Sequence, residues 1–162
     1  MDAQEFLILE TDVAAQLALI DDVFANLEDR AGDFDADDAR QTESVAYQIH
    51  NVYNAFEELL RLIAAHFEYQ VADASRWHSA LLQRMTQPIP GVRPAPLTKE
   101  TFLLLEVLRG FRYFFRHAYA ATVVPDQVQS NLGRARRAHN FLRRDLAAFL
   151  GQLKPRCAIC AA

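Results

Sequence analysis

The sequence has few of the features that mark the common catalytic and membrane-protein classes. Its 162 residues include two cysteines, Cys157 and Cys160, and both lie in the last six positions. It contains no Gly-rich phosphate loop, no combination of Ser, His and Asp typical of hydrolases, and no internal repeat. No apolar run approaches the ~18 residues that a transmembrane helix needs. These absences disfavour a P-loop nucleotide-binding protein, a triad hydrolase, a repeat protein and a membrane protein.

The two cysteines and the start of the chain bear on metal binding and on the cellular compartment. Cys157-x2-Cys160 is only half of a zinc site, so we expect no metal there and interpret residues 154–162 as a flexible tail. Asp2 and Glu5 stand where a secretory signal would carry basic residues. We therefore expect a cytoplasmic protein that does not associate with a membrane.

The net charge is mild, but charges are unevenly distributed along the chain. The formal value of -4 at pH 7 does not by itself indicate a nucleic-acid partner. The first forty residues are rich in Asp and Glu and hold only two arginines. Between positions 134 and 144, five arginines occur without an acidic residue: Arg134, Arg136, Arg137, Arg143 and Arg144. An acidic N-terminal part is thus expected to face a basic C-terminal part.

Apolar residues spaced three or four positions apart predict four long amphipathic helices. The expected ranges are 3–30, 38–70, 99–119 and 125–153, with one short helix near 75–86. Apolar residues make up 51% of the chain, and this length suits one domain with its own core. We therefore predict an all-α protein, a bundle of four long antiparallel helices plus one short helix, with a single domain over residues 1–153.

Several residues are expected to begin, interrupt or closely pack these helices. Asp37 or Asp38 is predicted to cap the second long helix, and Thr98 the third. The segment 87–97, QPIPGVRPAPL, holds four prolines and one glycine, so it cannot be helical. Gly110 is an unusual residue inside a helix, and its place on the apolar side suggests that another helix approaches closely.

The second long helix carries a polar stripe whose role the sequence leaves open. Its members are Glu43, His50, Asn54, Glu57 and Arg61. They fit a solvent-exposed face with helical ion pairs. Alternatively, Asn54, Glu57 or the neighbouring Tyr53 lines a cleft opposite the third long helix. In the last helix, His139 occupies a core-type position, which favours a buried and hydrogen-bonded histidine.

One stretch, LRGFRYFFRHAYA at residues 108–120, combines cations, a histidine and aromatic residues at the end of the third long helix. Histidine moves protons near neutral pH, and arginine presents a permanently charged, planar fork to phosphate. RNA supplies its own nucleophile, the 2'-hydroxyl, so this set suits RNA cleavage without a metal or cofactor. The alternative is a solvated helix end whose cations interact with the helix dipole.

Within this stretch, the pattern Arg112-x4-His117-x-Tyr119 resembles the active-site motif of the HEPN superfamily, and its spacing is similar to that of HepT-type ribonuclease toxins. The resemblance implies a HEPN-like bundle that forms a homodimer, with two motif helices lining a shared cleft. It implies endoribonuclease activity with Arg112 and His117 as catalytic residues. It also implies a partner, a nucleotidyltransferase (MNT-type) antitoxin that adenylylates Tyr119.

Two features of the motif leave alternatives open. Arg112 and His117 lie about 140° apart on a regular helix, so the arginine reaches round, the helix breaks, or two copies meet in a dimer. Tyr113 follows the motif arginine where the superfamily often has a polar residue. A catalytically inert HEPN-like module that binds RNA or a protein is therefore the second hypothesis.

Four further arginines are candidates for contact with an RNA backbone: Arg109, Arg116, Arg134 and Arg137. Those of the last helix also suit a solvated face or pairing with the acidic first helix.

Overall fold

The computed structural model describes residues 1–67, 77–117 and 123–155, and it describes no side chain for residues 77–79, 116 and 117. Five helices make up this part of the chain: α1 (Ala3–Ala31), α2 (Ala39–Phe67), α3 (Trp77–Met85), α4 (Lys99–His117) and α5 (Pro125–Leu153). Four are long and one is short, and the described residues contain no strand. The predicted all-α class and the number of helices are confirmed.

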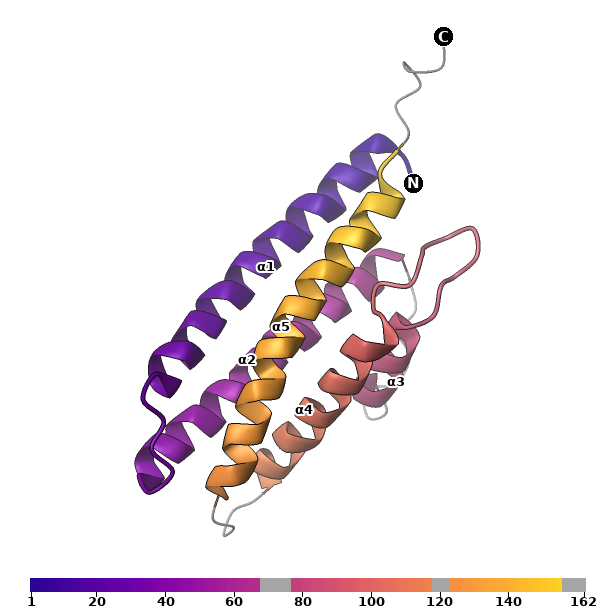
Figure 1. Ribbon diagram of the computed structural model, residues 1–162. Helices are drawn as coiled ribbons and strands as arrows, with labels where there is room; N and C mark the ends of the chain where they lie inside the picture. The colour runs from indigo at the N-terminus through magenta and orange to yellow at the C-terminus, as the bar shows by residue number, and fades with distance from the viewer. Residues whose placement is uncertain (68–76, 118–122, 156–162) are drawn as a thin grey trace.

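The four long helices run alternately up and down, and α3 lies beside the bundle (Figure 1). Contacts between distant positions follow this antiparallel order. Gln16 of α1 donates to the carbonyl of Ala55 in α2, and Arg112 of α4 meets Asn54 of α2. The start of α1 and the end of α5 lie at the same end of the bundle (Figure 1). The polar stripe of α2 and the motif helix α4 are therefore direct neighbours.

The bundle is stabilised by the apolar stripes that the sequence predicted. Residues fully or nearly fully buried include Leu9, Val13, Ile20 and Leu27 of α1, Val45, Ile49, Val52, Phe56, Leu59 and Ile63 of α2, and Leu142, Leu146 and Phe149 of α5. Each large apolar side chain contributes about 1.5 to 3 kcal/mol when it leaves water. None of the described helices is long and apolar enough to cross a membrane.

Ion pairs join the acidic α1 to the basic α5. Asp21 accepts hydrogen bonds from His139 Nε2 at 2.8 Å and from Arg143 at 2.7 Å. Glu28 and Arg136 form a two-pronged pair with both distances at 2.8 Å. The His139 ring is largely buried and stacks on Phe24 with ring centres 4.2 Å apart, as predicted for a hydrogen-bonded core histidine.

These pairs select among the arginines of α5. Arg136 and Arg143 are the arginines that pair with α1. The sequence had left this pairing open for Arg134 and Arg137 instead. Arg144 binds Asp145 and Glu100 instead. The acidic and basic parts of the chain do face each other, and Arg134 and Arg137 remain outside that seam.

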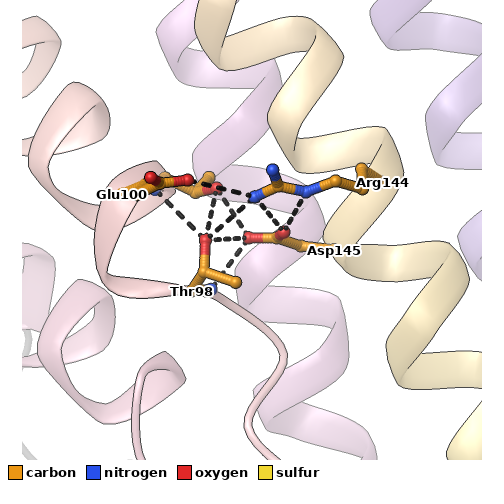
Figure 2. A network of polar contacts seen from close by, with 5 residues as sticks. Thr98, Glu100, Arg144 and Asp145 are labelled. Atoms are coloured by element: carbon orange, nitrogen blue, oxygen red, sulfur yellow. Dashed lines mark hydrogen bonds and ion pairs between the residues drawn. The ribbon is translucent and has the colours of Figure 1, made fainter.

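A polar network fixes the beginning of α4 against α5 (Figure 2). One carboxylate oxygen of Asp145 accepts from the Thr98 amide at 2.8 Å, the Thr98 hydroxyl at 2.8 Å and the Thr101 hydroxyl at 2.6 Å. The other oxygen accepts from the Arg144 guanidinium at 2.9 and 3.1 Å. Thr98 also accepts from the Thr101 amide, so its predicted role as a cap is confirmed. Asp145 thus sets where the motif helix starts.

The connector between α3 and α4 is non-helical, as its prolines require. Ile89 and Arg93 form an isolated bridge around Gly91, whose φ of 77° is a conformation that favours glycine. Arg93 is 3% exposed, and its guanidinium donates to the backbone carbonyls of Gln87, Pro94 and Arg84. This buried arginine stabilises the turn.

At the start of α2, Asp38 accepts from the amides of Arg40 and Gln41 and is the cap.

The prediction that another helix of the bundle approaches Gly110 closely is wrong. A Cβ atom built at this position would meet no atom within 4 Å. The reason is that the apolar arc of α4 is wider than the faces that α2 and α5 cover. Gly110 lies on the uncovered part of that arc, so no bundle helix contacts it.

We predict that Asp145→Ala lowers the free energy of unfolding by about 3 kcal/mol at pH 7, because three donors lose their shared acceptor and Arg144 loses a buried partner. Burial opposes ionisation of Asp145, but hydrogen bonds from Thr101 and Thr98 outweigh it and hold its pKa below the ordinary 3.8. The stabilisation is therefore complete above about pH 4 and is lost as the pH falls through the lowered pKa.

Chemical denaturation at a series of pH values measures this difference between wild type and Asp145→Ala. Asp22→Ala, on the exposed side of α1, is the matched control and should change stability by less than about 0.5 kcal/mol. An Asp145→Ala difference that stays constant down to about pH 2 would contradict the role of the ionised carboxylate.

Candidate functional site

Arg112 is held against α2 by three residues. Its Nε donates to Asn54 Oδ1 at 2.6 Å, and its Nη2 lies 3.6 Å from a Glu57 carboxylate oxygen. The guanidinium carbon lies 5.6 Å from the centre of the Tyr53 ring, in cation–π geometry. Only 14% of the Arg112 side chain is exposed, and 6% of Glu57. The arginine is therefore fixed along one edge rather than extended into solvent.

The polar stripe of α2 serves both of the roles that the sequence left open. Asn54 and Glu57, in the middle of α2, form a wall that faces α4 together with Tyr53. Glu43 and Arg61, nearer the ends, are exposed, and Arg61 pairs with Glu58 on its own helix.

His50 extends this polar cluster by one helical turn. Its Nε2 lies 2.9 Å from Asn54 Nδ2, and its ring lies 5.8 Å from the ring of Phe115 in α4. Sequence reasoning did not join His50 to Arg112, although the spacing of four between His50 and Asn54 predicts contact on a helix.

Burial raises the pKa of Tyr53 far above its ordinary value, so its phenol stays neutral beneath the guanidinium.

The other candidate arginines have separate partners. Arg109 forms a two-pronged ion pair with Glu106, both distances being 3.0 Å, and this hydrogen bonding raises its pKa. Arg134 donates to Ser130 and Asn131, and Arg137 lies over the Phe141 ring at 5.8 Å. Within the described part of the chain, no carboxylate pairs with Arg134 or Arg137, and neither of them contacts Arg112.

The remaining predicted residues fall at the edge of the description. His117 is the last residue of α4, and the side chains of His117 and Arg116 are outside the described part. Tyr119, in the range 118–122, and both cysteines, in the range 156–162, lie outside the described residues. The structure thus places Arg112 with Asn54 and Glu57, and the geometry among the motif residues stays a prediction.

An apolar stripe runs along the outer face of α4. We define the α4 stripe as Leu103, Val107, Gly110 and Phe114, which step by four, three and four positions and so share one face. Leu103, Val107 and Phe114 are 54%, 45% and 39% exposed. A groove of about 330 Å³ lies between this stripe and the start of α5, where Gln127 and Asn131 line it. Large exposed apolar side chains in one row mark an interaction surface.

Comparison with known proteins identifies one match. A family model described as HepT-like protein matches residues 44–153. This range holds most of α2 and all of α3, α4 and α5, so it includes Asn54, Glu57 and Arg112. No curated protein and no solved structure matches the chain.

Proposed function

This chain belongs to the HepT-like family of the HEPN superfamily, and we propose that it is a metal-independent endoribonuclease toxin. The observation that carries the proposal is the geometry of Arg112. Its guanidinium is held along the Nε edge, while Nη1 makes no hydrogen bond within the described residues. A fixed cation with an unused donor suits the charge that builds on a phosphate during cleavage.

The proposed reaction uses a nucleophile that the RNA carries. The 2'-oxygen attacks the neighbouring phosphorus, a new P–O bond forms, and the bond to the 5'-oxygen breaks. His117 accepts the 2'-hydroxyl proton, and a proton is delivered to the leaving 5'-oxygen. Arg112 stabilises the negative charge on the non-bridging phosphate oxygens. The products are a 2',3'-cyclic phosphate end and a 5'-hydroxyl end.

We propose that the active form is a homodimer joined through the α4 stripe. The stripe supplies an apolar centre, and Glu106, Arg109 and Tyr113 supply a polar rim on one side, as in stable interfaces. Gly110 has open space at its Cβ position, which lets a second α4 come close. Because a twofold interface places the same surface on both copies, two motif helices would line one cleft.

The arginines outside the α1–α5 seam are proposed to bind the RNA backbone. Arg134 contacts Asn131, which lines the groove beside the α4 stripe, and Arg137 follows one turn later on α5. Both lack a carboxylate partner among the described residues, so their charge is available to phosphate. Arg109 and Arg116 on α4 are further candidates for this surface, and phosphate would compete with Glu106 for Arg109.

The proposed regulator is a nucleotidyltransferase antitoxin that modifies Tyr119. The tyrosine oxygen attacks the α-phosphorus of a nucleoside triphosphate, a phosphodiester forms, and pyrophosphate leaves. The added phosphate would be two residues of sequence from His117. Its negative charge would pair with the cations meant for RNA, and its bulk would fill the cleft.

The dimer is tested with Val107→Glu, which puts a charge in the centre of the α4 stripe. We expect light scattering at micromolar concentration to give a dimer mass for wild type and a monomer mass for this variant, because an unpaired charge is costly in an apolar interface. Leu19→Glu, at a residue of α1 that is 57% exposed, is the control and should remain dimeric. A monomeric wild type would refute the shared cleft.

Catalysis is tested with His117→Ala and Arg112→Lys. Each should lower the rate of RNA cleavage by about 100-fold or more, because the first removes the proton carrier and the second removes the planar fork. His66→Ala and Arg40→Ala, far from the motif in sequence, are the controls and should cleave like wild type. Cleavage at the wild-type rate by His117→Ala, with matched circular dichroism, would remove His117 from the mechanism. RNA binding without cleavage by the wild type would favour the inert RNA- or protein-binding module.

Regulation is tested by co-expression with a nucleotidyltransferase encoded next to this chain. Wild type should gain an adenylyl group and lose ribonuclease activity, whereas Tyr119→Phe should stay active because it lacks the acceptor oxygen. Tyr113→Phe, at a tyrosine of α4 that is 67% exposed, should be silenced like wild type. Mass spectrometry that finds the adduct elsewhere, or silencing of Tyr119→Phe, would show that Tyr119 is not the target.

A further inference from the structure

We propose that Asn54 of α2 is the residue that positions Arg112 for phosphate binding, a role that rests on the proposed ribonuclease function. The hydrogen bond from Arg112 Nε to Asn54 Oδ1 is the shortest contact that the arginine makes, at 2.6 Å. It joins the motif helix to a different helix, across 58 positions of sequence. Asn54 therefore acts on the reaction through Arg112 and does not itself touch RNA.

The orientation of the Asn54 amide follows from the chemistry of its partners. Arginine has only donors, so the atom that faces Arg112 Nε must be the amide oxygen. The amide nitrogen then points to His50 Nε2, 2.9 Å away. Because Asn54 Nδ2 is a donor, His50 Nε2 must accept, and its proton lies on Nδ1. Asn54 is thus held at both ends, which prevents the amide from turning away from Arg112.

The neutrality of Asn54 is the reason that this residue suits the role. A carboxylate at 2.6 Å would hold the guanidinium equally well but would neutralise the charge that phosphate needs. The one carboxylate near Arg112 within the described residues, Glu57, lies a full ångström farther away at 3.6 Å. The chain therefore fixes the direction of Arg112 with a neutral oxygen and adds no second carboxylate to its ion pair with Glu57.

The position of Asn54 is itself well defined by the core. Its neighbours Val52, Tyr53 and Phe56 are at most 1% exposed and anchor α2 in the bundle. Rigid support of this kind matters, because a misplacement of about 1 Å lowers catalysis by about 100-fold. A residue that holds Arg112 from a buried helix is accordingly expected to change turnover more than substrate affinity.

The test uses the full-length chain and a synthetic mixed-sequence single-stranded RNA. Asn54→Leu removes both hydrogen bonds at nearly constant shape, and we expect kcat to fall about 100-fold with a much smaller change in KM. Asn54→Asp keeps an acceptor for Arg112 but adds a charge, so kcat should fall less than in Asn54→Leu while KM rises. Asn51→Leu, one turn earlier on α2, removes an amide that bonds to Gln48 on the same helix and is the matched control.

A double-mutant cycle with Arg112→Lys separates positioning from general stability. If Asn54 acts through Arg112, Asn54→Leu should lower kcat much less in the Arg112→Lys background than in wild type. Equal losses in both backgrounds, or a lowered Tm with unchanged kcat, would overturn the positioning role. If Asn54→Leu turns over like wild type while Arg112→Lys is impaired, only this inference fails. If the wild-type chain cleaves no RNA, the proposed function fails with it.

Discussion

The carboxylate of Asp145 fixes the start of α4, and the geometry of the candidate site depends on that fixed start. α4 spans 19 residues, or about 28 Å, so a small tilt at Thr98 would displace Arg112 near its other end by several ångströms. The carboxylate binds three donors at the start of α4, and both Asp145 and Thr101 are buried. Asn54 then holds the same helix near its other end. Two polar attachments, on α5 and α2, thus define where the motif arginine lies.

The distribution of ion pairs explains how a mildly acidic protein can present a basic surface. The acidic α1 binds Arg136 and Arg143 of α5, and Glu106 binds Arg109 within α4. These pairs stabilise the bundle but neutralise the cations that they contain. Arg134 and Arg137 lie on another side of α5, without a carboxylate partner in the described part of the chain. The net charge therefore says little about the local charge that an RNA backbone would meet.

Two outcomes differ from the sequence-based expectations: the divided role of the α2 stripe and the exposure of Gly110. Both concern how much of the surface of α4 its neighbouring helices cover. The α2 stripe lines the site at His50, Asn54 and Glu57, whereas its members Glu43 and Arg61 are exposed. Gly110 marks no close contact within the bundle, because the apolar arc of α4 extends beyond its neighbours. Sequence periodicity shows that a residue is on an apolar or polar arc. It does not show which part of that arc another helix covers.

The sequence by itself determined the helical class, the number of helices and their main buried stripes, because these depend on local spacing and on prolines and caps. It also identified the motif and its family, because the spacing from Arg112 to Tyr119 is written in consecutive residues. Only the tertiary structure decided that Asn54 faces Arg112 and that Asp145 accepts hydrogen bonds from Thr98. It also decided which arginines of α5 pair with α1, namely Arg136 and Arg143 rather than Arg134 and Arg137. Each of these contacts joins residues at least 47 positions apart, and their meeting depends on how whole helices pack.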